Sequence, residues 1–204
     1  MSGLIAIDTS GPVPVVAARE AGSLRYAEVG DQPRAHAEEI GPMLLAAREL
    51  LTAAPAAVVV GRGPGAYTGL RVGIVAARTL GWAWDVPVLG ICSLDVLAAQ
   101  SPGFTGTVVT DARRGELYWA RYRAGSRVEG PGVAGRDELG GLSGPVLGDA
   151  ELIGDPDRRR AGTTVLAPSA LASAAVLAQT TDLADAQDTE PIYLRRPDIG
   201  ASRG

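Results

Sequence analysis

The sequence contains few of the side chains on which most enzyme sites depend. Among its 204 residues there is one histidine, His36, one cysteine, Cys92, and no lysine, so all 19 basic residues are arginine. The absence of lysine excludes Schiff-base chemistry and the phosphate-binding lysine of a P-loop. One histidine and one cysteine cannot supply the usual zinc ligands. A catalytic triad is not expected either, because neither Ser10 nor Cys92 has a second histidine nearby. We therefore predict no metal site and no catalytic residue.

Long apolar runs and an excess of positive charge are also absent. No apolar stretch approaches the roughly 20 residues that cross a bilayer, and no membrane contact is expected. The net charge is −4, which argues against a protein that binds nucleic acid alone, because phosphate contacts dominate that affinity. The single cysteine allows no internal disulfide and fits a reducing compartment. We therefore expect a cytoplasmic protein.

The pattern of elements that remains is typical of an α/β fold with a mixed sheet. The first half predicts three strands, then helix, strand, helix, strand and a short helix. Their expected bounds are 4–8, 13–18, 24–29, 36–51, 57–61, 68–84, 88–91 and 93–100. The Ser-Pro-Gly sequence at 101–103 interrupts the pattern, and we predict a boundary there between lobes 1–100 and 101–204.

The second half predicts strands at 107–111 and 116–123, joined by a turn over 112–115. Residues 125–162 are rich in Gly, Pro, Asp and Arg, and within them only 146–148 has the pattern of a strand. A further strand is possible at 164–166, and an alanine-rich helix is predicted at 169–179. A strand that ends on aspartate and leads into a turn and a second strand occurs twice, at Asp8 and at Asp111, which suggests a duplication.

The most informative segment is VVVGRGPGAYTGLRVGIVAARTLGW at 58–82, a strand, a glycine-rich turn and a helix. Such a unit directs a helix N-terminus at one spot, which suits an anion. Gly61, Gly63 and Ala66 match the spacing of a dinucleotide fingerprint, but Asp85 precedes the next strand instead of ending it. This placement disfavours an NAD-binding module.

Within the helix, Gly69, Gly73, Ala77 and Gly81 recur at every fourth position. Glycine inside a helix costs about 0.5–1 kcal/mol relative to alanine, so a face of small residues needs a compensating close contact. Two readings remain: the chain's own sheet and preceding helix bury this face, or it forms a subunit interface. We expect an interface, and we expect a bulky residue at Gly73 to abolish pairing while the monomer stays folded. The predicted partner-binding residues are Ile40, Met43, Leu44, Ala47, Gly69, Leu70, Gly73, Ile74 and Ala77.

Two polar clusters are candidates for nucleotide contact. Asp8, Thr9 and Ser10 end the first strand, where they could donate to phosphate oxygens or only satisfy a local turn. Arg113 and Arg114 stand at a predicted hairpin tip, where they could clamp an anion or pair with Asp111 and Glu116. The possible nucleotide-contacting residues are Asp8, Thr9, Ser10 and Arg113.

Four motifs together closely resemble the bacterial TsaB family: LIAIDTSG at 4–11, the 58–82 segment, DARRGELYWARY at 111–122 and EPIYLRR at 190–196. The resemblance implies an actin/hexokinase-like (ribonuclease-H-like) two-lobe fold with a reduced second lobe. It also implies a non-catalytic subunit that pairs with TsaD for threonylcarbamoyl transfer to adenosine 37 of ANN-decoding tRNAs. The TsaD family binds its metal through a paired-histidine motif that this sequence lacks.

The resemblance further implies a TsaE-like ATPase in a larger complex, a homodimer when the chain is alone, and tRNA contact only through the complex. It predicts no cofactor of the chain's own, with ATP or ADP possible at the interface with the partner. The alternative is a stand-alone ATP-dependent phosphotransferase of the actin/hexokinase type, which the short second lobe disfavours.

Overall fold

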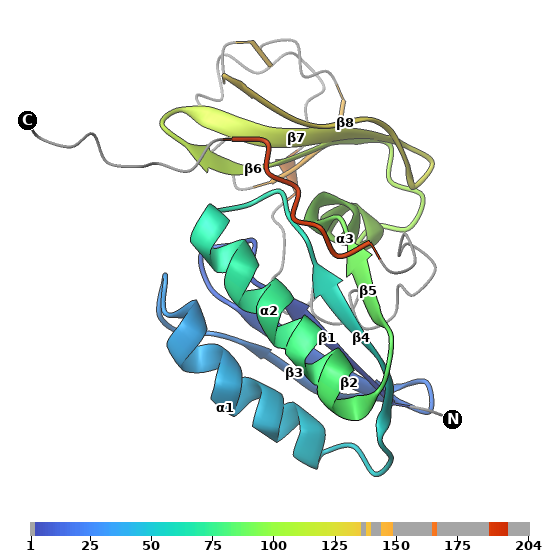
Figure 1. Cartoon of the computed structure of the whole chain (residues 1–204). Helices are drawn as coiled ribbons and strands as arrows, with labels where there is room; N and C mark the ends of the chain where they lie inside the picture. The colour runs from blue at the N-terminus through green and yellow to red at the C-terminus, as the bar shows by residue number, and fades with distance from the viewer. Residues whose placement is uncertain (1–2, 136–137, 140–143, 149–164, 167–187, 196–204) are drawn as a thin grey trace, which may run out of the picture.

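The computed structural model describes residues 3–135, 138–139, 144–148, 165–166 and 188–195 (Figure 1). The helix predicted at 169–179 lies outside the described residues. The described part holds three helices and two five-stranded sheets.

The first sheet has the strand order β3-β2-β1-β4-β5. Strands β1 to β3 form an antiparallel meander, and β4 and β5 run parallel to β1. Its strands are β1 (Gly3–Asp8), β2 (Val15–Glu20), β3 (Ser23–Val29), β4 (Pro55–Gly61) and β5 (Val88–Ile91). All five lie within a few residues of their predicted positions. The parallel strands β1 and β4 are almost continuously apolar, and consecutive residues along them are buried on both faces of the sheet.

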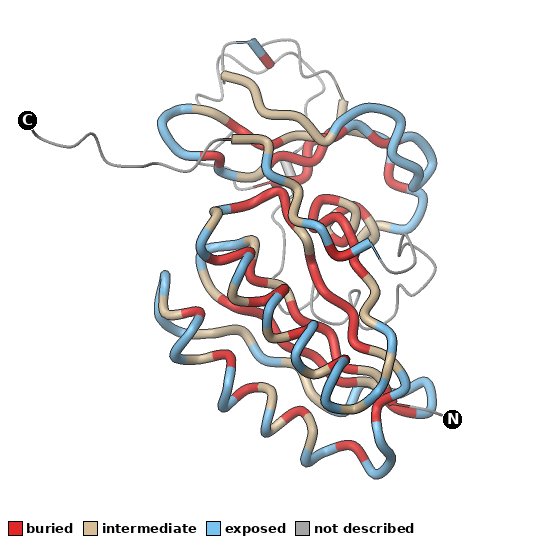
Figure 2. Tube along the Cα trace, in the orientation of Figure 1, coloured by how far each residue is buried: buried red, intermediate tan, exposed pale blue. Residues whose placement is uncertain are grey.

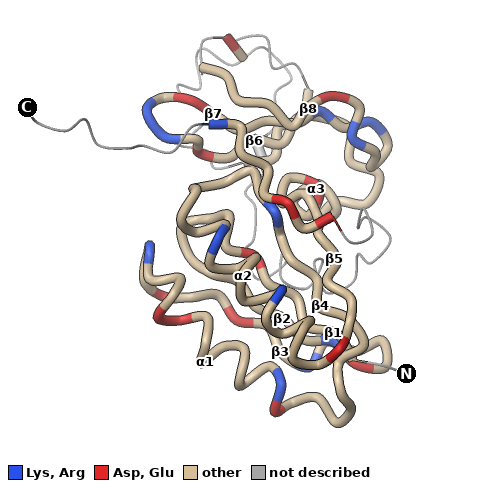
Figure 3. The backbone as a smooth tube through the Cα atoms, viewed as in Figure 1, with Lys and Arg blue, Asp and Glu red and all other residues tan. Residues whose placement is uncertain are grey.

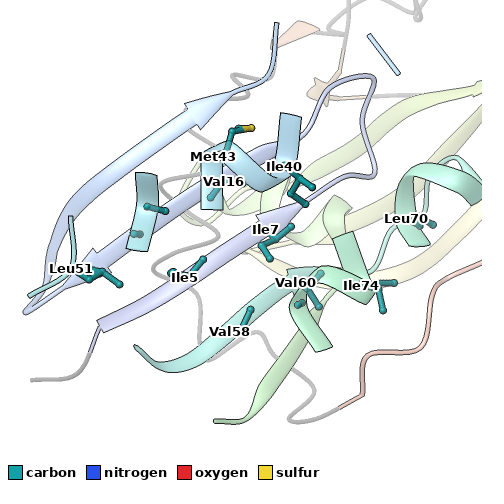
Figure 4. Packing of buried hydrophobic residues seen from close by; sticks show 13 residues of the cluster. Ile5, Ile7, Val16, Ile40, Met43, Leu51, Val58, Val60, Leu70 and Ile74 are labelled. Carbon is teal, nitrogen blue, oxygen red and sulfur yellow. The ribbon is translucent and has the colours of Figure 1, made fainter. Parts of the chain in front are cut away.

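Helices α1 (His36–Glu49) and α2 (Tyr67–Trp84) cover one face of this sheet side by side (Figure 1). Apolar residues at helical spacing, including Ile40, Met43, Leu70 and Ile74, point from the two helices onto the sheet (Figure 4). The short helix α3 (Ser93–Ala99) contacts the other face. Its Val96 packs on the first sheet, whereas Leu94 and Ala98 pack on the second. Helix α3 is therefore the packing element between the two sheets.

The second sheet repeats the connectivity of the first. Its order is β10-β9-β6-β7-β8, with β6 to β8 antiparallel and β9 and β10 parallel to β6. Its strands are β6 (Gly106–Arg113), β7 (Glu116–Arg123), β8 (Ser126–Gly135), β9 (Val146–Leu147) and β10 (Val165–Leu166). The duplication suggested by the two aspartates is thus present in the topology, and the last two strands have only two residues each.

Strand β8 corrects the prediction that 146–148 is the only strand-like part of 125–162. It is an edge strand whose first half is exposed, so the alternation of apolar and polar residues that marks a half-buried strand is missing. Its pairing with β7 follows a tight turn in which Ala124 and Gly125 both have positive φ. The position of β8 is therefore determined by the turn and by its pairing with β7, and the hydropathy of its residues indicates neither.

Candidate partner-binding and nucleotide-contact site

The small-residue face of α2 lies against the chain's own first strand. A Cβ added at Gly69 would lie 2.7 Å from the carbonyl oxygen of Thr9, and one added at Gly73 would lie 2.3 Å from the Thr9 hydroxyl. The backbone N–H of Gly73 also donates to that hydroxyl at 3.1 Å. The compensating close contact of Gly69 and Gly73 is therefore made inside the chain, by Thr9 directly after β1, as in the first of the two readings.

The nine predicted partner-binding residues are also packed within the monomer. Eight of them are buried in the monomer, and Leu44 is partly buried. They form much of the core over the first sheet, so their contact with a partner stays a prediction. Whether a bulky residue at Gly73 leaves the monomer folded stays a prediction, and its side chain would enter the packed space around Thr9, so the fold should lose stability.

The outward faces of α1 and α2 carry large apolar side chains that sequence reasoning did not select. Leu45 is 68% exposed, Val75 60% and Trp82 86%. In Figure 2 the two helices alternate buried inner positions with exposed outer ones. The available signal was that α2 is apolar nearly all round, whereas one sheet can bury only one side of a helix.

The glycine-rich turn between β4 and α2 is packed against the end of β1. A Cβ at Gly61 would meet the Asp8 carboxyl at 2.3 Å, and one at Gly65 would meet the Ser10 backbone at 2.6 Å. Gly63 has a φ of +93°, a left-handed conformation that favours glycine. These glycines admit the chain's own Asp8–Ser10 segment at the place where the sequence suggested an anion.

Asp8 is the most unusual ionisable group of this site. Its carboxylate accepts from the backbone N–H of Ser10 at 2.8 Å. Burial raises the pKa of Asp8 above its usual value, although hydrogen bonds from Ser10 and Ser93 and the proximity of His36 oppose the rise. Carboxyl groups with a raised pKa are common in functional sites. Buried carboxyl groups with a purely structural role show the same rise.

The neighbours of Asp8 have defined structural partners. Thr9 is fully buried, and its hydroxyl is engaged by Gly73, so its side chain packs inside the fold. His36 begins α1 and bonds the Gly11 carbonyl through Nε2 at 3.0 Å. Ser93 exchanges hydrogen bonds with the backbone of Gly63, which ties α3 to the glycine-rich turn.

The Asp111 hairpin repeats the Asp8 geometry in the second sheet. The Asp111 carboxylate accepts from the backbone N–H of Arg113 at 2.8 Å, two residues on, as Asp8 does from Ser10. The two loop residues, Arg114 and Gly115, both have positive φ, which suits a tight two-residue hairpin loop, and Arg113 before them has positive φ as well. Within residues 3–135, Arg113 forms no hydrogen bond or ion pair with Asp8, and each of them is bonded within its own turn.

Two further findings concern the described residues. They contain no group of three or more His, Cys, Asp or Glu side chains placed to hold a metal ion. None of the described helices has the length and apolar character that crossing a membrane requires.

Comparison with known proteins gives a consistent set of relatives. Residues 31–136 match the TsaD family model, described as tRNA N6-adenosine threonylcarbamoyltransferase. An uncharacterized protein of Mycobacterium tuberculosis is 40% identical over 209 residues, covering 97% of this chain and 94% of its own. The tRNA threonylcarbamoyladenosine biosynthesis protein TsaB of Escherichia coli is 34% identical over 130 residues, covering 59% of this chain and 54% of its own.

The solved structure of YeaZ from Pseudomonas aeruginosa superposes with a TM-score of 0.66 at 25% identity, covering 95% of this chain and all of that one. The fold is accordingly the predicted actin/hexokinase-like, ribonuclease-H-like one. With the matched family model and these relatives, the chain belongs to the TsaB (YeaZ-like) family.

Proposed function

We propose that this chain is a non-catalytic subunit of tRNA threonylcarbamoyladenosine synthesis. In this role it pairs with a TsaD-like subunit that transfers the threonylcarbamoyl group to adenosine 37 of ANN-decoding tRNAs. The observation that carries the proposal is the match of the chain to relatives named for the biosynthesis of this nucleoside.

The division of labour between the two subunits rests on the composition of the chain. Half of it matches a transferase family model, yet it has one histidine, which itself bonds the Gly11 carbonyl. A paired-histidine metal site is therefore impossible on this chain alone. The metal, ATP and the threonylcarbamoyl donor belong to the partner proteins, including a TsaE-like ATPase in the larger complex.

The pairing surface in this proposal is the outer face of α1 and α2. Leu45, Val75 and Trp82 are the exposed apolar side chains there, and exposed apolar groups of this size on neighbouring helices are typical of interfaces. The buried residues named from the sequence set the spacing of the two helices. In the absence of a partner the same face would support a homodimer, and tRNA would be reached only through the complex.

The direct test is the mass of the chain by light scattering, alone and mixed with a TsaD-like subunit from the same cell. The proposal predicts a 1:1 complex that replaces a homodimer. Val75→Glu should weaken this complex at least tenfold because it buries a charge at the interface. Val128→Glu is the matched control, since Val128 is 55% exposed on the edge strand β8.

A chain that stays indifferent to the TsaD-like subunit would contradict the proposal. So would ATP turnover by the isolated chain that is lost in Asp8→Ala, which is the behaviour of a stand-alone phosphotransferase.

A further inference from the structure

Residues 188–195, which contain most of the EPIYLRR motif, have no role in the pairing described above. They form no regular strand or helix, yet they cross from the first sheet to the hairpin of the second (Figure 1). We call residues 188–195 the strap.

One end of the strap is bound to α2 and to the glycine-rich turn. Asp188 forms an ion pair with Arg62, and Arg78 donates to the Thr189 hydroxyl at 2.9 Å and to Glu190 at 2.7 Å. The N–H of Ile192 donates to the carbonyl of Arg62 at 2.8 Å. This end follows the side of α2 and extends the hydrogen bonding of the first lobe.

The strap backbone also fits closely against β5. A Cβ at Gly90 would lie 1.9 Å from the carbonyl oxygen of Asp188. Gly90 is buried, and any larger residue would push the strap away. A glycine is thus required at position 90 by its contact with Asp188, almost a hundred residues later in the sequence.

The other end of the strap is bound to the second sheet. Arg195 donates to the carbonyl of Ala112 at 2.7 Å and forms an ion pair with Glu116 at 3.0 Å. Both partners belong to the β6–β7 hairpin, and the basic residues of this region lie together in Figure 3. Between the two ends, the ring of Tyr193 stacks on Tyr67 of α2 with centroids 4.8 Å apart.

The remaining connections between the two sheets are unevenly distributed. Helix α3 packs on the second sheet through a large apolar cluster that includes Phe104 and Tyr122. At the hairpin end, the Tyr118 hydroxyl donates a long hydrogen bond of 3.4 Å to the Gly65 carbonyl. The described part of the chain is therefore joined by packing at α3 and by polar contacts of the strap at the hairpin.

We propose that the strap is a latch that holds the β6–β7 hairpin against the glycine-rich turn, and that its release lets the second sheet pivot about α3. The latch consists mainly of ion pairs and hydrogen bonds, with one aromatic stack and the packing of Ile192 against the apolar cluster around α3. Opening it therefore exposes only a small part of the core. It controls access to the seam between Gly65 and Tyr118, which adjoins the Asp8 segment. The inference does not depend on the proposed function, since it concerns contacts within one chain.

Hydrogen exchange measured by mass spectrometry tests the latch in the full chain. In the double variant Arg78→Gln and Arg195→Gln, exchange in 61–66 and 111–118 should rise about tenfold, because each end loses a charge-assisted hydrogen bond. Exchange in α1 and in the β1–β2 pair should stay unchanged. The control is Arg121→Gln, which removes an ion pair with Glu129 that lies away from the strap. At 2.7 Å this ion pair has the same length as that of Arg78 with Glu190.

A steric variant gives an independent measurement. Gly90→Ala displaces the strap without removing any charge and should raise exchange in the same two segments. The latch is refuted if the charge variants leave 61–66 and 111–118 as protected as in the wild type. A uniform rise over the whole chain refutes it as well, because the strap would then contribute only to global stability.

Discussion

The two halves of the chain share one strand connectivity but differ in what covers it. In the first half, α1 and α2 bury a continuous core over strands of four to seven residues. In the second half, β9 and β10 have two residues each, and the described cluster on the outer face of the sheet is small. Among the described residues, the first sheet carries long strands under two helices, whereas the second consists mainly of the antiparallel strands β6 to β8 and packs on α3.

The two aspartates show what this difference means for chemistry. Asp8 and Asp111 make the same turn hydrogen bond at 2.8 Å. Asp8 is enclosed by the glycine-rich turn and α3, and burial raises its pKa, whereas Asp111 is exposed. A repeated local motif therefore does not imply a repeated function, because the environment of each carboxyl sets its protonation.

The largest expected effect is on the free energy of unfolding, compared between core variants of the two halves. Leu70→Ala should lower the free energy of unfolding by about 4–5 kcal/mol, because Leu70 is fully enclosed between α2 and the sheet and the site cannot collapse. Leu117→Ala, in the smaller cluster of the second sheet, should cost about 2–3 kcal/mol. Urea unfolding measures both, and equal losses would contradict the unequal packing of the halves.

The next effect concerns the helical glycines of the first half. Gly73→Ala should cost about 1–3 kcal/mol, since its Cβ would overlap the Thr9 hydroxyl. Gly41→Ala makes the same chemical change in α1 at an exposed position, where no atom other than its chain neighbours lies within 4 Å. The gain in helix propensity is offset there by Pro42, which disfavours a Cβ on the preceding helical residue, so the change should stay within about 0.5 kcal/mol. Thermal or urea unfolding measures both variants, and equal changes would contradict the internal contact of Gly73.

A smaller expected effect is a difference between the two aspartates in how their contribution to stability depends on pH. Because burial raises the folded pKa of Asp8, the folded state binds its proton more tightly than the unfolded state, whose pKa is about 4. The stabilising contribution is complete below about pH 4 and is lost as the pH rises through the folded pKa. Asp8→Asn removes this loss and should be more stable than the wild type at pH 7, with no difference below pH 4.

Asp111→Asn serves as the control and should change stability by less than about 0.5 kcal/mol at either pH, because Asp111 is exposed. The measurement is the free energy of unfolding in urea at several pH values. If Asp8→Asn were less stable than the wild type at pH 7, the carboxylate of Asp8 would be a favourable ion in the fold.

Hydropathy and turn chemistry were sufficient to predict most of the fold. The strand 88–91 and the strand 116–123 have the predicted bounds, because apolar or aromatic runs ending at Gly, Pro or Ser specify them locally. Strand β8 was missed because edge pairing needs no apolar pattern. The resemblance to the TsaB family, now confirmed, supplied the two-lobe topology that local patterns only suggested.

The site was harder to predict because burial depends on distant partners. The spacing of Gly69 and Gly73 showed that something approaches α2 closely, but spacing cannot say that Thr9, some 60 residues earlier, is that group. The same limit applies to Gly90 and the strap. The apolar character of α2 nearly all round indicated that some apolar residues stay exposed, but it could not say that Trp82 is one of them.

The most direct measurement of the central claim is threonylcarbamoyladenosine formation by a TsaD-like subunit, with its donor and ATP, in the presence and absence of this chain. The account predicts that the chain increases product formation strongly, that Val75→Glu removes the increase, and that Asp8→Asn retains it. An increase that survives Val75→Glu but disappears in Asp8→Asn would contradict the account, because the work would then be done at Asp8 and not through the α1–α2 face.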